Sequence, residues 1–197
     1  MTDTTTNVVG ILLAAGRSRR FEGNKLIAKL PNSVPIGIQS AVNLKSCVDE
    51  LIVVVNPIDV ATKQAFNHYG FKVEVSELSR SGMGHSLSHG VSCSAGATHW
   101  IVGLADMPHL KEHTLSKLKK YLVQHNQITV PVFGTKIGHP VGFPLQYKTK
   151  LLKLSGDRGA RGILDANTAE TFFFMSSDSG TVRDIDFKLD LSNSNSR

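Results

Sequence analysis

The sequence predicts an α/β protein in which helices cover both faces of a largely parallel β-sheet. Short apolar runs recur along the chain, and segments with helical periodicity lie between them, an alternation that is typical of this architecture. The chain has 197 residues and is 41% hydrophobic, which is enough for the core of one compact domain. We therefore expect a single three-layer α/β/α domain with a mostly parallel, mixed sheet.

The expected strands are short apolar runs that are bounded by turn signals. The first, Val8–Ala14, starts with the apolar run Val-Val-Gly-Ile-Leu-Leu and leads directly into a glycine turn. This pattern suits a buried strand better than a helix. The other strands, in chain order, are expected at Leu51–Val55, Lys72–Val75, Trp100–Leu104, Gln127–Val132 and Thr171–Met175.

Helical patterns fill the intervals between these runs. The clearest is Thr114–His125, in which Leu115, Leu118, Tyr121 and Leu122 form one apolar stripe. The lysine-rich face of this segment is expected to be a solvated surface. The other helices are expected at Ile36–Cys47, Val60–Tyr69, Leu87–Cys93 and Tyr147–Leu154.

The two ends of the chain differ in composition from the rest. We expect a flexible N-terminus over residues 1–7, one domain over 8–191, and a polar, disordered tail over 192–197. The sequence carries neither a signal-peptide pattern nor an apolar stretch of about 18 residues. A cytoplasmic protein that does not associate with membranes is expected.

Composition also limits the ligands. Lys and Arg number 22 against 16 Asp and Glu, which gives a net charge of +6. The positive charges are scattered and aromatic residues make up only 7%, without the basic and aromatic interleaving that stacks bases. Small anionic substrates, rather than nucleic acid, are the expected partners. The two cysteines, Cys47 and Cys93, and the histidines show no metal-ligand spacing, so neither a zinc site nor a disulfide framework is predicted.

A basic glycine turn follows the first expected strand. Gly16 lets backbone N–H groups approach an anion closely, while Arg17, Arg20 and Lys25 add charge and directional donors. The turn is not a P-loop, because Lys25 does not directly follow a glycine and no Ser or Thr comes after it. The pattern predicts a cradle for a polyphosphate, with an ordinary basic turn as the alternative.

A carboxylate lies at the end of the fourth expected strand. Ligands of open α/β sheets bind outside the carboxyl ends of the strands, and Asp106 stands there in Leu-Ala-Asp-Met-Pro. Pro108 ends the strand and directs the carboxylate out of the sheet, although a capping role for Asp106 is an alternative. Mg²⁺ usually takes one or two protein carboxylates when a substrate supplies phosphate oxygens, so a second acid is expected.

Three glycine-containing segments complete the set of motifs. Gly82-Met83-Gly84-His85-Ser86-Leu87 places two glycines before a helical pattern, which frees backbone donors and a helix N-terminus to face a nucleotide. The residues 138–143 and 156–161 are polar turns whose chemistry alone assigns no role. A structural histidine and surface arginines are the alternative there.

Taken in order, these motifs resemble those of nucleotidyltransferases with the glycosyltransferase-A-like fold. The likeness is strongest to the molybdenum cofactor cytidylyltransferase branch of the molybdopterin nucleotidyltransferase family, and it runs from about residue 8 to 191. The motifs that carry it are Leu13-Ala14-Ala15-Gly16 with Arg20 and Lys25, Gly82–Leu87, Leu104-Ala105-Asp106-Met107-Pro108, Gly138-His139-Pro140-Val141, Gly156–Arg161 and Asp184-Ile185-Asp186. The chain departs from the family pattern at Glu22, where Gly is usual, and at Phe187 and Lys188, which replace Thr-Pro.

The resemblance implies a nucleotide-diphospho-sugar transferase (Rossmann-like) fold and specific site residues. Arg20, Lys25 and Asp106 are implied as catalytic, and Mg²⁺ is implied on Asp106 and Asp186, with Asp184 as the alternative to Asp186. His139, Arg158 and Arg161 are implied to bind the pterin substrate. The implied nucleotide-binding residues are Leu13, Ala14, Ala15, Gly16, Arg17, Arg20, Lys25, Gly82, Gly84, Ser86 and Asp106.

The reaction implied by the resemblance joins CMP from CTP to molybdopterin-bound molybdenum and releases pyrophosphate. Ala15 stands where the guanylyl branch carries Gly, and its methyl group favours a pyrimidine. The alternatives are a guanylyltransferase or another NTP transferase on the same fold, or a non-catalytic carrier that delivers the cofactor to an apo molybdenum hydroxylase. A monomer or weak oligomer is expected.

Overall fold

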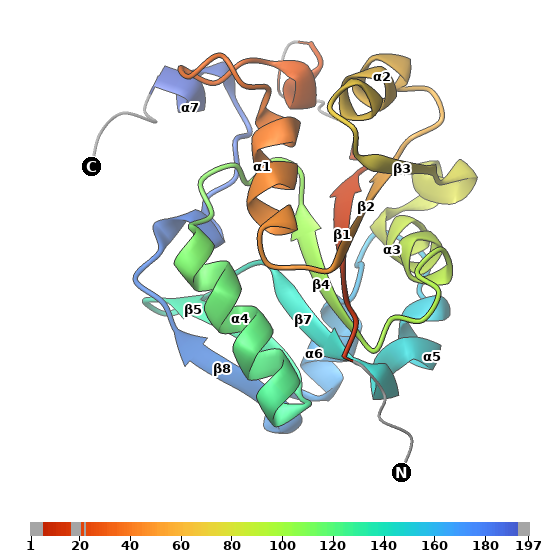
Figure 1. The fold of residues 1–197 in the computed structure, drawn as a ribbon, viewed down its shortest axis with the longest axis vertical. Helices are drawn as coiled ribbons and strands as arrows, with labels where there is room; N and C mark the ends of the chain where they lie inside the picture. The colour runs from red at the N-terminus through yellow and green to blue at the C-terminus, as the bar shows by residue number, and fades with distance from the viewer. Residues whose placement is uncertain (1–5, 17–20, 22, 193–197) are drawn as a thin grey trace.

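A computed structural model describes residues 6–16, 21 and 23–192. Its centre is an eight-stranded sheet in the order β3-β2-β1-β4-β7-β5-β6, with β8 paired to β5 (Figure 1). The strands are β1 Val8–Ala14, β2 Glu50–Val55, β3 Lys72–Val75, β4 His99–Leu104, β5 Ile128–Phe133, β6 Lys136–Ile137, β7 Val141–Pro144 and β8 Thr171–Met175.

The helices lie between the strands in the sequence, except for the last two, which follow β8. The α-helices are α1 Ile36–Lys45, α2 Val60–His68, α3 Met83–Ser92, α4 Glu112–His125, α5 Lys148–Leu152, α6 Arg161–Ala166 and α7 Lys188–Ser192. The short 3₁₀ helices are η1 Lys25–Ile27, η2 Glu77–Ser81, η3 Leu145–Tyr147, η4 Thr168–Glu170 and η5 Ser179–Val182. Among the described residues, no helix is both long and apolar enough to span a lipid bilayer.

The sheet is mixed and mostly parallel, as predicted. Strands β3, β2, β1 and β4 are parallel neighbours, and β5 is parallel to β8. Strand β7 is antiparallel to both β4 and β5, and β6 is antiparallel to β5. All six predicted strands are present.

Strand β7 corrects the interpretation of residues 138–143 as a polar turn. Its four residues are fully buried between β4 and β5. The strand is short, prolines stand at Pro140 and Pro144, and Gly142 breaks the apolar run, so no strand pattern is visible in the sequence. Gly142 is needed for packing, since a Cβ there would lie 3.0 Å from a methyl group of Leu122 on α4.

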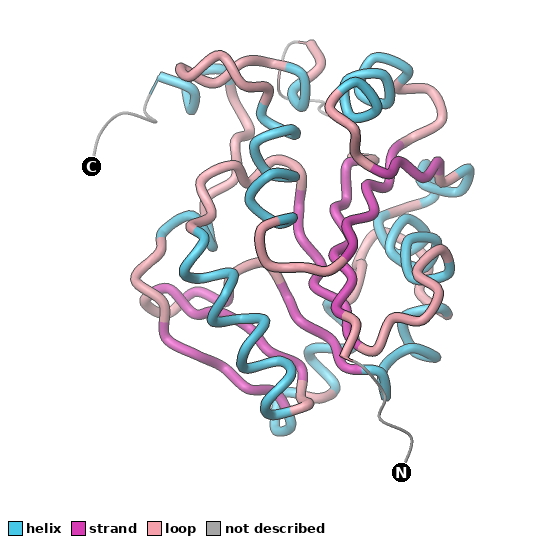
Figure 2. Tube along the Cα trace, viewed as in Figure 1, coloured by secondary structure: helices cyan, strands magenta, loops and turns pink. Residues whose placement is uncertain are grey.

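Alternation along the strands creates a core on each face of the sheet. In β1, Val8 and Leu12 pack with α1, α2 and α4, whereas Val9 and Ile11 pack with α3, α5 and α6. Figure 2 shows helices on both sides of the strands. The predicted three-layer arrangement is therefore confirmed, and the carboxyl ends of β1 and β4 meet at one edge of the sheet.

Two helix predictions need revision. Helix α3 begins at Met83, before the predicted start at Leu87, and so includes Gly84 in its first turn. The predicted helix over Tyr147–Leu154 is split into η3 and α5 and ends at Leu152. Helix α6 was not indicated by the sequence, because its six residues are too few to show a period.

Candidate functional site

A cavity of about 420 Å³ opens at the carboxyl edge of the sheet. Its walls come from the end of β1, from η2 and the start of α3, from the end of β4, and from the loop before α6. The lining residues are Leu13, Ala15, Gly16, Ser79, Arg80, Gly82, Met83, Ser86, Leu104, Asp106 and Asp157. Five of the predicted nucleotide-binding positions, Leu13, Ala15, Gly16, Gly82 and Ser86, therefore share one cavity with the predicted catalytic Asp106.

The turn that carries Asp106 is held by α1 and β1. The Ser40 hydroxyl donates a hydrogen bond to the Ala105 carbonyl oxygen at 2.9 Å, and the Ala105 N–H donates to the Leu13 carbonyl oxygen at 3.1 Å. The Asn43 side chain donates to the Pro108 carbonyl oxygen at 2.8 Å. These three bonds satisfy backbone groups beyond the end of β4 and fix where the Asp106 carboxylate points.

Three carboxylates converge at the rim of this cavity. One oxygen each from Asp106, Asp184 and Asp186 lies within 4.8 Å of the others. Asp106 and Asp186 have side chains that are 25% and 26% exposed, and Asp184 is exposed. Like charges repel at this distance unless a cation lies among them.

Lys25 supplies a positive charge to this cluster. Its Nζ lies 2.7 Å from Asp106 Oδ2 and 3.3 Å from Asp186 Oδ1, and its side chain is only 9% exposed. The lysine is placed by η1, where Asn24 caps the helix by accepting a hydrogen bond from the Leu26 N–H. The Asn24 amide in turn donates to Asp59 Oδ1 at 2.7 Å, at the N-cap of α2.

The two C-terminal acids reach Asp106 through a backbone contact. The Ile185 N–H donates to the Asp106 carbonyl oxygen at 2.9 Å, and the buried Ile185 side chain packs with Phe21 and Ile36. The segment around these two acids has no regular secondary structure. Both carboxylates nevertheless join the cluster, so Asp184 is a third member rather than a substitute for Asp186.

Some predicted residues are placed differently or not described. Arg17 and Arg20 lie outside the described residues. Ala14 is not among the cavity-lining residues: its side chain is 2% exposed and packs in the core on the α1 face. Ala14 was predicted to bind the nucleotide because it belongs to the Leu13-Ala14-Ala15-Gly16 motif. Side chains alternate along β1, however, so Ala14 and Leu13 point to opposite faces of the sheet.

The two glycines of the Gly-Met-Gly motif bring two backbones together. A Cβ at Gly82 would lie 2.2 Å from the Gly156 carbonyl carbon, and one at Gly84 would lie 2.6 Å from the Ser155 carbonyl oxygen. The Gly84 N–H donates to the Gly156 carbonyl oxygen at 2.8 Å, and the Gly82 N–H donates to the Ser79 carbonyl oxygen at 3.2 Å. The N–H groups of these two glycines therefore each have an acceptor within the protein.

Two residues of the cavity wall, Ser79 and Arg80, lie outside the motifs, and a third, Asp157, lies in the Gly156–Arg161 motif but was given no role. Ser79 is 8% exposed, and its buried hydroxyl has no hydrogen-bond partner among the described residues. Arg80 and Asp157 line the same cavity and are exposed. The only sequence signal was their nearness to glycine motifs, since neither periodicity nor spacing marks residues in short loops.

A second, smaller cavity of about 150 Å³ adjoins the first and shares Leu13, Met83 and Leu104 with it. His139, Arg158 and Arg161 all line it, so the three residues predicted for the second substrate do come together. The arginines are exposed and both reach Asp165, with Arg161 Nε at 2.8 Å and Arg158 Nη2 at 3.4 Å. The rest of the wall is largely apolar.

His139 links the second cavity to the acids. Burial lowers the pKa of its imidazole, the nearby charges of Asp106 and Asp184 act in the opposite direction, and Arg161 lowers the pKa further. The imidazole is therefore neutral at pH 7, and its Nδ1 atom is buried without a hydrogen-bond partner among the described residues. Its backbone is anchored by a hydrogen bond from the His139 N–H to the Thr181 carbonyl oxygen at 2.7 Å.

A mixed α/β sheet, a polar cavity at its carboxyl edge and the chain's likeness to solved nucleotidyl transferase structures define an α/β nucleotidyltransferase fold. The chain belongs to the family of the MobA-like NTP transferase domain, which matches residues 10–171. The resemblance of the motifs to molybdopterin nucleotidyltransferases is thereby confirmed at the level of the family.

Curated relatives match nearly the whole chain. The purine catabolism protein PucB of Bacillus subtilis is 28% identical over 189 residues, which cover 91% of each protein. The nicotine blue oxidoreductase of Paenarthrobacter nicotinovorans is 26% identical over 190 residues, which cover 91% of this chain and 92% of that protein. The names of these two relatives point to different activities, so likeness of this degree shows the family and not the reaction.

Solved structures share the fold. The crystal structure of Rv0371c from Mycobacterium tuberculosis has a TM-score of 0.81 at 22% identity and covers 95% of this chain and 97% of that one. A second structure of Rv0371c is a complex with manganese, with a TM-score of 0.72 at 22% identity over 87% of this chain and 89% of that one.

Proposed function

We propose that this protein transfers the CMP group of CTP to the terminal phosphate of molybdopterin that carries molybdenum, and releases pyrophosphate. The observation that carries the proposal is the convergence of Asp106, Asp184, Asp186 and Lys25 beside the first cavity, which Asp106 lines. The first cavity is the proposed nucleotide site, and the second is the proposed site for the pterin substrate. In this chain the Ala15 methyl group at the cavity wall favours the smaller pyrimidine base.

The acid cluster fits a divalent cation. Mg²⁺ and Mn²⁺ prefer oxygen ligands, and three carboxylate oxygens lie within 4.8 Å of one another. The manganese complex of Rv0371c supports a metal site in proteins of this fold. A cation held by Asp106 and Asp186, with Asp184 beside them, would polarise the α-phosphate and neutralise its charge.

The protein's own residues position the reactants and balance their charge. An oxygen of the acceptor phosphate attacks the α-phosphorus of CTP, the new O–P bond forms, and the bond to the bridging oxygen breaks as pyrophosphate leaves. Lys25 Nζ lies at Asp106 and Asp186, where its ammonium group would stabilise the charge on the leaving pyrophosphate while the same acids would hold the cation. No covalent enzyme intermediate is needed.

The second cavity supplies contacts for the acceptor. The neutral imidazole of His139 offers its buried Nδ1 to a hydrogen-bonding group of the pterin. Arg158 and Arg161 are positioned by Asp165 at the exposed rim, where guanidinium groups pair well with phosphate oxygens. Bound in this way, the acceptor would lie directly beside the nucleotide cavity, with which the second cavity shares Leu13, Met83 and Leu104.

A turnover panel tests the proposal. We expect pyrophosphate release from CTP in the presence of purified molybdenum cofactor and Mg²⁺ or Mn²⁺, with far less from GTP, ATP or UTP and none in EDTA. The Asp106→Asn variant should lose about 10²- to 10³-fold in kcat, because it removes one electrostatic group from the reaction centre.

The matched control is Asp165→Asn, which removes a carboxylate at the arginine rim and should raise KM for the cofactor more than it lowers kcat. A preference for GTP would assign the guanylyl reaction instead. Cofactor binding with no pyrophosphate release from any nucleotide would refute the transfer reaction and favour a carrier role.

A further inference from the structure

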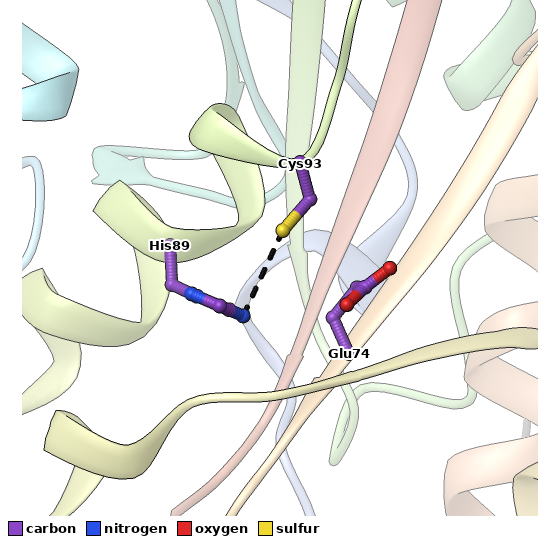
Figure 3. Close-up of side chains that lie close together, drawn as sticks. All are labelled: Glu74, His89 and Cys93. Carbon is purple, nitrogen blue, oxygen red and sulfur yellow. Dashed lines mark hydrogen bonds between the residues drawn. The ribbon is translucent and has the colours of Figure 1, made fainter.

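A second cluster of metal-ligating side chains lies away from the cavities. Figure 3 shows Glu74, His89 and Cys93 close together on β3 and at the end of α3. One ligand atom from each lies within 4.8 Å of the others, and His89 Nε2 is 3.7 Å from Cys93 Sγ. All three residues are partly exposed, so solvent ions can reach them.

The fold brings these residues together for identifiable reasons. β3 is an edge strand, and its Val73 and Val75 pack into the core on the α2 face, so Glu74 points to the opposite face. His89 and Cys93 are four residues apart and therefore share one side of the α3 helix end. Gly90 lets the helix lie close to the sheet, because a Cβ there would be 2.8 Å from the Ile11 side chain.

We propose that Glu74, His89 and Cys93 form a binding site for a thiophilic divalent cation of the Zn²⁺ class. A carboxylate, an imidazole and a thiolate are the three protein ligand types that Zn²⁺ takes, and three of them leave a coordination position for water. The hard cations Mg²⁺ and Mn²⁺ are suited instead to the all-oxygen cluster at Asp106. The nearby Lys72 makes an ion pair with Glu50 at 2.7 Å.

A cation at this site would join two elements that flank the nucleotide cavity. The chain between Glu74 and His89 contains η2 and the start of α3, which supply Ser79, Arg80 and Gly82 to the cavity wall. Coordination of one cation by Glu74 on β3 and by His89 and Cys93 at the end of α3 would hold the two ends of this segment together. Binding in the folded state should therefore raise thermal stability and restrict the motion of the segment.

Titration with Co²⁺, a spectroscopic substitute for Zn²⁺, tests the site on the full chain without nucleotide. We expect a thiolate-to-cobalt charge-transfer absorption that added Zn²⁺ displaces and excess Mg²⁺ does not. Zn²⁺ should also raise the Tm. Cys93→Ser should abolish the absorption, and His89→Gln and Glu74→Gln should weaken Zn²⁺ binding by at least roughly 10- to 100-fold.

Two controls separate this site from the rest of the molecule. Cys47→Ala removes the other thiol, whose pKa burial raises to about 12, and should leave the absorption unchanged. Asp106→Asn should do the same, because it alters only the oxygen cluster. If Cys93→Ser fails to fold, the two surface variants at 74 and 89 decide the question.

The proposal fails if no charge-transfer absorption appears, or if the Glu74 and His89 variants bind Zn²⁺ as tightly as the natural chain. Neither result bears on nucleotidyl transfer, which depends on other residues.

Discussion

At the scale of single residues, Lys25 connects parts of the chain that are far apart in sequence. Its ammonium group lies 2.7 Å from Asp106 and 3.3 Å from Asp186, and it is nearly buried. An unpaired buried lysine is costly, and so are three neighbouring carboxylates without a cation. The lysine and the acids therefore stabilise one another, and the proposed divalent cation would supply the same positive charge.

Replacing Lys25 by methionine tests this exchange. We expect Lys25→Met to destabilise the protein in EDTA by about 1–3 kcal/mol, less than for a fully buried pair because the acids are partly solvated. Added Mn²⁺ should raise the Tm of the variant more than that of the natural chain, because the cation replaces the missing charge. Thermal melts with and without Mn²⁺ measure both effects.

Lys119→Met is the matched control, since Lys119 makes a surface ion pair with Asp49 at 3.0 Å. Its small loss of stability should not respond to Mn²⁺. If Mn²⁺ raised the Tm of the Lys25 variant and of the natural chain equally, this would contradict the proposal that the cation and the Lys25 ammonium group neutralise the same acids.

At the scale of elements, the first turn of α3 depends on contact with the loop at 155–156. Gly82 has a φ of +125° and Gly84 lies in the first helical turn, and both approach the other backbone too closely for a side chain. The contact ties together one wall of the proposed nucleotide cavity and the segment that carries Asp157 and Arg158. These glycines are therefore needed for packing between loops.

Adding one methyl group at Gly84 tests how much this close contact between the two backbones contributes. Gly84→Ala places a Cβ 2.6 Å from a backbone oxygen, so we expect a loss of about 1–3 kcal/mol of stability and weaker nucleotide binding. Gly162→Ala on α6 is the control, because nothing lies within 4 Å of its Cβ. The control should be neutral or stabilising by about 0.5–1 kcal/mol, as thermal melts and nucleotide titrations can measure. A Gly84 variant as stable as the control would show that the loops separate at little cost.

At the scale of the whole molecule, one buried and two half-buried histidines make stability depend on pH. Burial is the main cause that lowers the pKa of His99, His109 and His139 from 6.5. Each is therefore neutral in the folded state at a pH where the unfolded chain already binds a proton. Since the unfolded state takes up more protons, stability is present above pH 6.5 and is lost as the pH falls below it.

Thermal melts between pH 7.5 and 5.5 check this direction. We expect the Tm to fall with pH, and each histidine contributes at most about 1.4 kcal/mol per pH unit. His109→Gln should flatten the dependence. His113→Gln, at an exposed position, should leave it unchanged. A Tm that rises toward pH 5.5 would contradict the assigned sign.

Local pattern accounts for most of the fold. The six predicted strands and the parallel arrangement of β1 to β4 follow from apolar runs separated by helical periodicity, signals that need no distant contact. Strand β7 and helix α6 were not predicted from the sequence, because such short elements gain their stability from burial against neighbouring elements.

The sequence by itself determined the family, the α/β fold class, the mostly parallel mixed sheet and the two motif groups that supply the acids and the basic turn. Only the tertiary structure decided that Asp184 joins Asp106 and Asp186, that Lys25 pairs with two of them, and that the Gly84 N–H is used within the protein. It alone placed Glu74 beside His89 and Cys93. The physical reason is that a motif records local conformation, whereas these contacts join residues that only the packing of the sheet and its helices brings within reach.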